Sequence, residues 1–383
     1  MSDVIVETDR LWVRRAVETL EAEGGRSSDT RLIALPLSGF EGIEFYFKDE
    51  SAHPTGSLKH RLAQSLIVYG ICNGLIGPDT VLVEASSGST AVSEAYYARL
   101  LGLKFYAVLP RSTSASKVEA IREHGGHIHF VDDPAAIYQE AQALAERENG
   151  YYLDQFTYAE RATDWRGTSN IAACLFEQMA QAGHKDPKWM IMSAGTGGTA
   201  ATIGRYILYN GLSTKLCVPD PEHSAFFDGW VNCDPDAVFP RGSRIEGIGR
   251  PRVEPSFVPN VIDAMVKIPD ATSIAAAHVL SGLLGRRVGA STGTNFIGML
   301  WAADQMRRNN ERGPIATLIC DHGERYADTY YSDTWLDQQG FDIAPAKAMI
   351  ERSIEIGQMA PDLILGRHEK ATPVELANNL CTA

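Results

Sequence analysis

Lys59 occupies the position in this sequence that is best suited to chemistry. The apolar run 43–47 predicts a strand, residues 53–57 (HPTGS) end it, and leucines at helical spacing predict a helix beginning near Lys59. Such strand-to-helix turns are where α/β proteins place reactive groups. A helix N-terminus disfavours a cation by about 0.3–2 kcal/mol, whereas bringing a lysine pKa near neutrality requires about 4 kcal/mol. The helix dipole alone is therefore too weak to activate this amine, whereas burial and an imine with a carbonyl cofactor would do so. The alternative is that Lys59 is an ordinary surface lysine whose charged end reaches the solvent.

A glycine-rich loop stands between a strand predicted at 189–194 and a helix predicted at 200–209. Its members are Gly195, Thr196, Gly197, Gly198 and Thr199. The N–H groups of such a loop converge on one point and form an anion nest. The loop lacks the lysine of GxxxxGK[ST] and the spacing of GxGxxG. It therefore predicts a phosphate site of another kind, with a simple tight turn as the alternative.

Two further loops of small and hydroxyl residues lie between a strand and a helix. The first follows a strand predicted at 80–85 and consists of Ser86, Ser87, Gly88, Ser89 and Thr90. Its hydroxyl and N–H groups suit a carboxylate, although Ser89 or Thr90 could serve only as a helix cap. The second loop, residues 289–293 (GASTG), contains Ser291 and also matches the GxSxG elbow of serine hydrolases.

Taken together and in this order, the four elements resemble the fold-type-II pyridoxal-phosphate enzymes, specifically the cysteine synthase-like family. The resemblance covers about residues 31–335 and rests on the segments PTGSxKxR, SSGxT, GTGGT and GxSxG. Each segment alone is a weak signal, but the four together are specific for this family. Within this family the sequence is most similar to the L-cysteine desulfhydrase branch.

The resemblance implies a role for each element. Lys59 would hold pyridoxal 5'-phosphate as an imine and, once freed, would remove the α-proton of the substrate. The glycine-rich loop would bind the cofactor phosphate, and Ser291 would form a hydrogen bond with the pyridine nitrogen. The loop 86–90 would bind the substrate carboxylate with the help of Gln155. Ser89 stands where the family usually has asparagine, beside the phenolic oxygen of the cofactor.

The reaction implied by this resemblance is α,β-elimination of L-cysteine to sulfide, pyruvate and ammonia. Cysteine synthase-type β-replacement on O-acetylserine is the alternative. The sequence departs from the synthases at Ser89, at residues 157–167, and at Arg250 and Arg252. These departures are expected to lie on the substrate side of the site. Two more distant alternatives are a serine hydrolase that uses Ser291 with Asp321, and a cofactor-binding protein without turnover.

Predicted strands and helices alternate along the chain, which implies an α/β protein with parallel or mostly parallel sheets flanked by helices. Strands are predicted at 43–47, 80–85, 104–110 and 127–132, and near Trp189, Leu216, Met265 and Ile315. The resemblance implies two domains like those of the tryptophan synthase β-subunit. The smaller domain is expected at 51–157, inserted into a larger one at 1–50 and 158–340. Residues 341–383 are expected to form a helical extension.

Composition narrows the possible partners. The 383 residues include 35 basic and 48 acidic side chains, for a net charge of -13. Without a basic run, neither nucleic acid nor an anionic membrane surface is an expected partner. No stretch approaches the roughly 18 apolar residues of a membrane span, and no apolar signal segment is seen, so a cytoplasmic location is expected. The expected partners are an amino-acid substrate and a second copy of the chain in a homodimer.

Cysteines and histidines are two further residue types that could do chemistry. The six cysteines are widely scattered and form no CxxC pair, which predicts reduced thiols. His124, His127 and His129 lie close together in the sequence, and two of them share a strand face. No further ligand has suitable spacing, so no metal site is expected.

Overall fold

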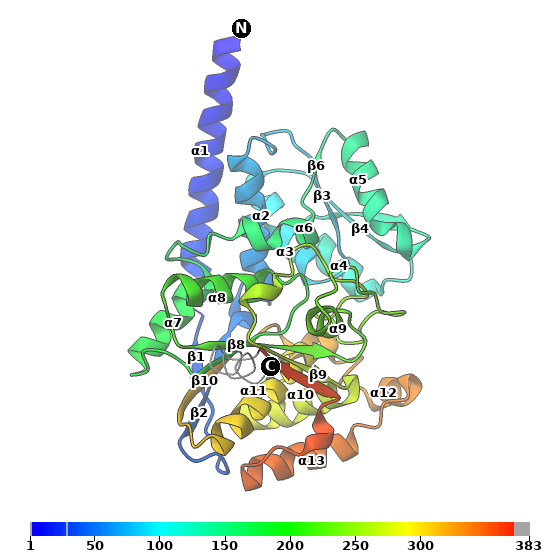
Figure 1. Ribbon diagram of the computed structural model, residues 1–383. Coiled ribbons are helices and arrows are strands. Elements are labelled where there is room, and N and C mark those ends of the chain that lie inside the picture. The colour runs from blue at the N-terminus through cyan, green and yellow to red at the C-terminus, as the bar shows by residue number, and fades with distance from the viewer. Residues whose placement is uncertain (1, 28–29, 371–383) are drawn as a thin grey trace, which may run out of the picture.

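The computed structural model describes residues 2–27 and 30–370, which form two sheets covered by helices (Figure 1). The four-stranded sheet lies in the upper part of the view and the seven-stranded sheet in the lower part. This arrangement confirms the predicted α/β class with mostly parallel sheets.

The larger sheet has five parallel central strands and an antiparallel strand at each edge. In spatial order its strands are β1 (Leu32–Ala34), β2 (Ile43–Asp49), β10 (Gly313–Ile319), β7 (Trp189–Ile191), β8 (Lys215–Pro221), β9 (Ala264–Ile268) and β11 (Gly366–Glu369). The central strands are almost wholly buried, because helices cover both faces. The sequence therefore shows β7, and most of β9 and β10, as apolar runs.

The helices around the larger sheet form two layers. They are α7 (Ile171–Gln181), α8 (Gly198–Tyr209), α9 (Phe226–Val231), α10 (Asp270–Leu284), α11 (Ala290–Arg308), α12 (Asp333–Gln339) and α13 (Ala344–Ile356). One apolar cluster joins the sheet to α10, α11 and α13, and another joins it to α7 and α8. Nearly every residue of α11 is buried, and its first turn is fixed beside the carboxyl end of β10.

The smaller sheet is parallel throughout. Its strands, in spatial order, are β5 (His127–Val131), β4 (Phe105–Pro110), β3 (Leu82–Ala85) and β6 (Tyr151–Tyr152). The helices of this part of the chain are α2 (Lys59–Cys72), α3 (Ser89–Leu101), α4 (Ala115–Glu123), α5 (Ile137–Arg147) and α6 (Gln155–Ala162). Separate apolar clusters lie on the two faces of the sheet, so this unit has a core of its own.

Helix α1 (Ser2–Ser27), which the sequence analysis did not predict, projects beyond the body of the molecule (Figure 1). Trp12, Ala16 and Leu20 recur every four residues and pack against the apolar cluster of the smaller sheet. That spacing is the helical signal that could have predicted α1.

The C-terminal region differs from the helical extension expected at 341–383. It contains α13, but β11 then pairs antiparallel with β9 and completes the larger sheet. The strand has the sequence GRHE and is largely exposed, so no apolar alternation marks it. The rest of the expected extension, residues 371–383, lies outside the described residues.

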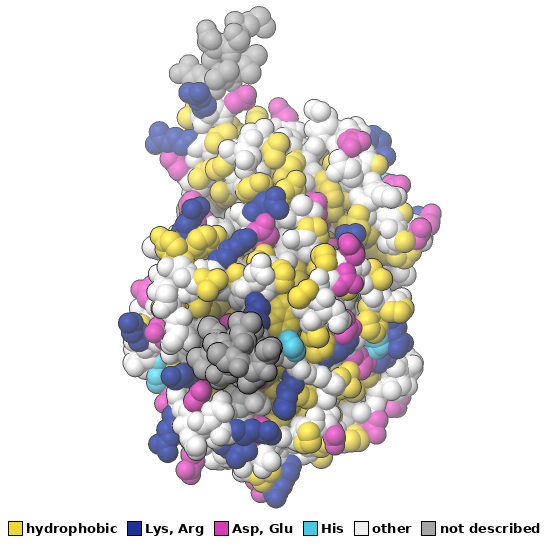
Figure 2. All heavy atoms as spheres, in the orientation of Figure 1, with side chains coloured by type: hydrophobic (Ala, Val, Ile, Leu, Met, Phe, Trp, Pro, Cys, Tyr) yellow, Lys and Arg dark blue, Asp and Glu magenta, His cyan; other side chains and the backbone are white. Residues whose placement is uncertain are grey.

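All the predicted strands are present, with boundaries shifted by a few residues, whereas β1, β6 and β11 were not predicted. Within the described ranges, no helix is both long and apolar enough to cross a bilayer. On the face shown in Figure 2, basic and acidic side chains are interspersed.

Candidate functional site

A cavity lies where residues from several distant segments meet at the carboxyl ends of β7 and β10. Seven of the predicted site residues line it: Lys59, Ser89, Gly195, Thr196, Gly197, Thr199 and Ser291. The cavity is also lined by residues to which the sequence analysis assigned no site role, among them Ser57, Gly247, Ile248 and Cys320. Asp321, considered only for a hydrolase, lines it as well.

Lys59 is positioned by contacts between the start of α2 and the end of β10. The N–H of Leu58 donates to the carbonyl oxygen of Cys320 at 2.9 Å, and Ser57 forms a β-bridge with Asp321. Burial lowers the pKa of Lys59, and the positive charge of Arg250 adds to this effect. The amine is therefore more readily available as a base than an ordinary lysine.

The glycine-rich loop fits a phosphate group, because close backbone packing forms it. A Cβ on Gly195 would lie 2.1 Å from the carbonyl oxygen of Gly247, so no side chain fits there. Gly197 has φ +91°, and its Cβ would lie 2.7 Å from Cα of Phe257. Gly198 begins α8, whose first N–H groups have no helical acceptor. The neighbouring segment that contains Gly247 could have been recognised from its Gly-Ile-Gly sequence.

Ser291 lies in the first turn of α11, is buried, and faces the same cavity. Beside it, Thr292 Oγ1 accepts a hydrogen bond from the Cys320 N–H at 3.1 Å, which ties α11 to the end of β10. Burial raises the pKa of Cys320 to about 12, so its side chain is a neutral thiol. Ser291 thus places an uncharged hydroxyl, which can donate or accept a hydrogen bond, in the lining of this cavity.

The predicted carboxylate-binding loop forms the start of α3, and only Ser89 of this loop lines the cavity. Thr90 Oγ1 donates to Oε1 of Gln155 at 2.8 Å, which brings these two predicted residues together. The Gln155 N–H in turn donates to Oε2 of Glu84 at 3.1 Å. The other predicted members lie outside the lining of this cavity: Ser86, Ser87, Gly88, Thr90 and Gln155, together with Gly198 of the glycine-rich loop.

Charged side chains connect the two sheet units across the site. Arg325, in the turn after β10, donates to the hydroxyl of Ser89 on the opposite unit. Lys117 of α4 lies 2.9 Å from a carboxylate oxygen of Glu246. No local signal in the sequence marks Arg325, because nothing in its neighbouring residues points to Ser89.

Arg250 and Arg252 form a second connection. Each lies 3.0 Å from an oxygen of the buried Glu254 carboxylate. The Arg250 guanidinium stacks 4.2 Å from the ring centroid of Phe156 and donates to Tyr138, and Arg252 lies over the Tyr138 ring. These two arginines therefore hold α5 and α6 against the larger sheet.

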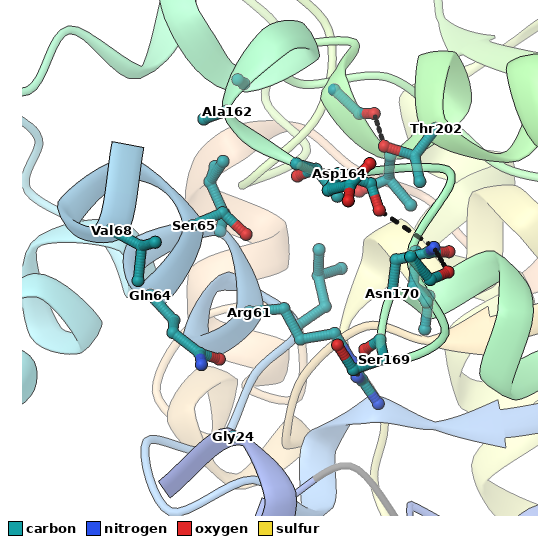
Figure 3. A pocket seen from close by; sticks show the side chains of 18 of the residues that line it. Gly24, Arg61, Gln64, Ser65, Val68, Ala162, Asp164, Ser169, Asn170 and Thr202 are labelled. Carbon is teal, nitrogen blue, oxygen red and sulfur yellow. Dashed lines mark hydrogen bonds between the residues drawn. The ribbon is translucent and has the colours of Figure 1, made fainter. Parts of the chain in front are cut away.

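Residues 157–167 were expected on the substrate side, but they lie behind the glycine-rich loop. There they form part of a second cavity of about 470 Å³, which Thr196 and Thr199 separate from the first. Figure 3 shows Ser65 of α2 on one side of this cavity and Asp164 and Asn170 on the other. The departure from the synthases at residues 157–167 thus lies on the side of the glycine-rich loop that faces the second cavity.

The arrangement does not favour a serine hydrolase. Asp321 accepts a hydrogen bond from the Tyr326 hydroxyl at 2.5 Å, and no hydrogen bond joins Ser291 to a histidine among the described residues. His322 is exposed, and His368 lies on β11 against the ring of Trp230. Asp321 is thus engaged by a tyrosine rather than by a catalytic imidazole.

The histidines considered for metal binding do not converge. In the described part of the chain, the one group with suitable geometry is Glu222, His223 and Asp270. Nε of Arg244 lies 3.5 Å from the Asp270 carboxylate, so a cation of the protein already shares that charge. Cys72, Cys174, Cys217, Cys233 and Cys320 are free thiols, as predicted, and Cys381 lies outside the described residues.

Comparison with known proteins agrees with this geometry. The family described as "Pyridoxal-phosphate dependent enzyme" matches residues 26–321. The chain belongs to this family. The resemblance seen in the sequence is thereby confirmed, and pyridoxal 5'-phosphate is the cofactor of this enzyme.

Individual relatives extend the comparison. The chain is 54% identical to L-cysteine desulfhydrase Cds1 of Mycobacterium tuberculosis over 347 residues, which is 89% of this chain and 94% of the relative. The solved structure of O-ureido-L-serine synthase superimposes with a TM-score of 0.70 at 24% identity, covering 80% of this chain and 96% of the other. That of the O-acetylserine dependent cystathionine β-synthase from Helicobacter pylori gives 0.66 at 26% identity, covering 79% and 95%.

Proposed function

We propose that this protein is an L-cysteine desulfhydrase, which eliminates sulfide from L-cysteine and leaves pyruvate and ammonia. The observation that carries the proposal is the 54% identity to a curated L-cysteine desulfhydrase over 89% of the chain. The site supports it, because the Lys59 amine, the glycine-rich loop and the Ser291 hydroxyl, which are suited to hold the cofactor, line one cavity.

When bound, pyridoxal phosphate supplies an electron sink for the α-carbon of an amino acid. Gly195, Gly197 and the start of α8 would hold its phosphate, and Lys59 its carbonyl carbon. Ser86, Ser87, Gly88, Thr90 and Gln155 would bind the substrate carboxylate next to Ser89.

The freed Lys59 amine removes the α-proton, and burial keeps that amine unprotonated often enough to act as a base. Ser291 carries no charge, so it does not hold a proton on the ring nitrogen as an aspartate would. This favours prompt loss of the β-substituent over transamination. Arg250 stacks on Phe156, the neighbour of Gln155 in α6. We propose that this contact narrows the access of a bulky second substrate and so favours elimination over β-replacement.

The test is incubation of the purified holoenzyme with L-cysteine alone. We expect sulfide and pyruvate in near-equal amounts. Lys59→Ala, which removes the base and the attachment point, should retain the fold and lose turnover. The same preparation is assayed with O-acetylserine and sulfide. If kcat/KM for cysteine formation is clearly higher than kcat/KM for sulfide release from L-cysteine, the protein is a synthase and not a desulfhydrase.

Three related assignments are proposals of the same kind. We propose that residues 51–157 form a smaller domain within the larger one and that two copies of the chain form a homodimer. The projecting α1, with its exposed Leu11, supports the homodimer. Analytical ultracentrifugation distinguishes a 41.8 kDa monomer from a particle of twice that mass. A cytoplasmic location is proposed as well and is tested by cell fractionation.

A further inference from the structure

The side chain of His60 is wholly buried next to Lys59, and the proposed mechanism assigns it no role. Adjacent positions of a helix point about 100° apart. Lys59 lines the cavity, whereas His60 packs among other aromatic rings. Its ring centroid lies 4.7 Å from that of Tyr97, 5.3 Å from that of Tyr96 and 5.1 Å from that of His53. A buried imidazole in this position needs hydrogen-bond partners for its nitrogens.

A chain of buried hydrogen bonds joins His60 to the first turn of α3. Nδ1 of His60 lies 3.2 Å from Oγ1 of Thr55, which lies 2.8 Å from Oγ of Ser93. The Ser93 hydroxyl donates to the carbonyl oxygen of Ser89 at 2.9 Å. On the other side of the ring, Nε2 of His60 lies 2.8 Å from the Tyr97 hydroxyl. All four side chains of this chain are buried, so water does not compete for these hydrogen bonds.

The last member of the chain fixes the direction of every hydrogen bond in it. A carbonyl oxygen only accepts, so the single hydroxyl hydrogen of Ser93 points to Ser89. Thr55 must then donate to Ser93, and its oxygen accepts from Nδ1 of His60. Nε2 carries no hydrogen and accepts from Tyr97. Burial lowers the pKa of His60 to about 3, which agrees with a neutral ring held in this one tautomer.

Both ends of the chain belong to segments that form the candidate site. Thr55 lies in the turn that leads to Lys59 at the start of α2. Ser89 begins α3 and lines the cavity, where its hydroxyl accepts a hydrogen bond from Arg325 of the larger unit. The start of α3 is therefore held on its cavity side by Arg325 and on its buried side by the chain from His60.

We propose that His60 is a positioning residue: as the neutral tautomer with its proton on Nδ1, it holds the carboxylate-binding loop at a fixed position relative to the Lys59 amine. A substrate whose α-proton is removed by Lys59 and whose carboxylate is bound by residues 86–90 needs both groups in register. His60 itself touches no reacting atom. The role rests on the part of the proposed function that assigns the substrate carboxylate to residues 86–90.

Two polar substitutions of His60 separate the roles of its two nitrogens. His60→Asn places an amide N–H where Nδ1 stands, so it keeps the donor to Thr55. His60→Gln places its amide near the position of Nε2, so it keeps an acceptor for Tyr97 and loses the donor to Thr55. Both variants remove the ring and its aromatic contacts. A difference between them therefore reports the hydrogen bond to Thr55 and not the packing of the ring.

Thr55 and Ser93 provide variants that leave the aromatic rings in place, in case the His60 variants do not fold. Thr55→Val keeps the shape and removes the hydroxyl, and Thr55→Ser restores the hydroxyl. Ser93→Ala breaks the chain at its next step. Thr214→Val is the matched control, because the buried Thr214 hydroxyl also donates to a backbone carbonyl, that of Pro187, at 2.6 Å. It precedes the amino end of β8, whereas the cavity lies at the carboxyl ends of the strands.

The measurement is the binding of two amines to the holoenzyme, followed by the absorbance of the bound cofactor. L-Alanine has a carboxylate and no β-leaving group, and ethylamine is the same molecule without the carboxylate. We expect the dissociation constant of L-alanine to rise about five- to tenfold in His60→Gln, Thr55→Val and Ser93→Ala, the effect of about one lost hydrogen bond, with that of ethylamine unchanged. His60→Asn and Thr55→Ser should remain within about twofold of the wild type.

Three results would overturn the proposal. Equal rises for L-alanine and ethylamine would indicate general damage to the site. Equal effects of His60→Gln and His60→Asn would indicate that only the packing of the ring matters. An unchanged constant for L-alanine in Thr55→Val and Ser93→Ala would show that the chain does not control the loop. Thr214→Val should lower the thermal midpoint of unfolding and leave both dissociation constants unchanged; a selective loss of L-alanine binding in this control would also contradict the proposal.

Sulfide release from L-cysteine is recorded on the same samples. If the wild type releases no sulfide while the two amines respond as expected, elimination fails as the proposed function but the positioning role of His60 stands. If sulfide is released and L-alanine binding is unaffected by the variants, only the role of His60 fails.

Discussion

The two sides of the site are built in different ways. The proposed cofactor side is made by backbone segments of the larger sheet that pack against each other, such as Gly195 against Gly247. The proposed substrate side is made by side chains that reach across from distant segments, such as Arg325 to Ser89 and Arg250 to Phe156. A backbone cradle tolerates no added atom, whereas a set of side-chain contacts can be altered one contact at a time. We therefore expect mutations on the cofactor side to abolish binding and those on the substrate side to tune the reaction.

The largest expected effect is that of Gly195→Ala on the cofactor side. The added Cβ would lie 2.1 Å from the Gly247 carbonyl oxygen, so two loops must move apart. We expect cofactor affinity to fall at least about 100-fold, because the converging N–H groups lose their geometry. The measurement is the cofactor dissociation constant by absorbance titration.

The control is Gly282→Ala, where a Cβ meets no atom within 4 Å in a helix. It should leave cofactor affinity unchanged and should stabilise α10 by up to about 1 kcal/mol. Comparable cofactor loss in both variants would remove the distinction between the two sides.

Arg325→Ala should have the next largest effect, on the substrate side. Loss of the contact with Ser89 leaves the carboxylate-binding loop less well held against the larger sheet. We expect KM for L-cysteine to rise about tenfold, with the absorbance of the bound cofactor unchanged. Arg352→Ala, which breaks an exposed ion pair with Glu355, should change neither quantity. A loss of bound cofactor in Arg325→Ala would contradict the proposed separation of the site into a cofactor side and a substrate side.

Arg250→Ala should change the pH dependence of kcat. Burial and the Arg250 charge both lower the pKa of Lys59, so removal of that charge raises the pKa. The acidic limb of the kcat profile, where Lys59 must lose its proton, should therefore move to higher pH by roughly half a unit to one unit. Arg250→Lys keeps the charge and loses the stacking, so it should leave the limb in place. A shift to lower pH, or equal shifts in both variants, would show that Arg250 acts only by packing.

Ser89→Ala should have the smallest effect, because it removes one hydroxyl that accepts from Arg325. We expect KM for L-cysteine to rise about two- to fivefold. In the double variant with Arg325→Ala, the effects should fall short of additive, since both changes remove the same contact. Strict additivity of the two changes in KM would indicate that Ser89 and Arg325 act independently.

The fold was largely predictable because buried parallel strands consist mostly of consecutive apolar residues, which are visible in the sequence. Strands β4, β7 and β10 are buried runs of this kind, and the loops after several strands carry small residues. Strand β11 could not be predicted, since it is polar and exposed and exists only because the edge of β9 is free to pair with it. Helix α1 was missed although Trp12, Ala16 and Leu20 mark its buried face.

By itself, the sequence determined the parts of the site that depend on local backbone geometry. Lys59 at a strand-to-helix turn, the glycine-rich loop and Ser291 at a helix start each carry their signal within a few neighbouring residues, and all three line one cavity. Only the tertiary structure decided which side chains meet across long separations in the chain, such as Arg325 with Ser89 and Arg250 with Tyr138. The physical reason is that turns and helix starts are set by local dihedral preferences. The charge of a carboxyl or the partner of a guanidinium is instead set by burial and by whatever the fold brings alongside.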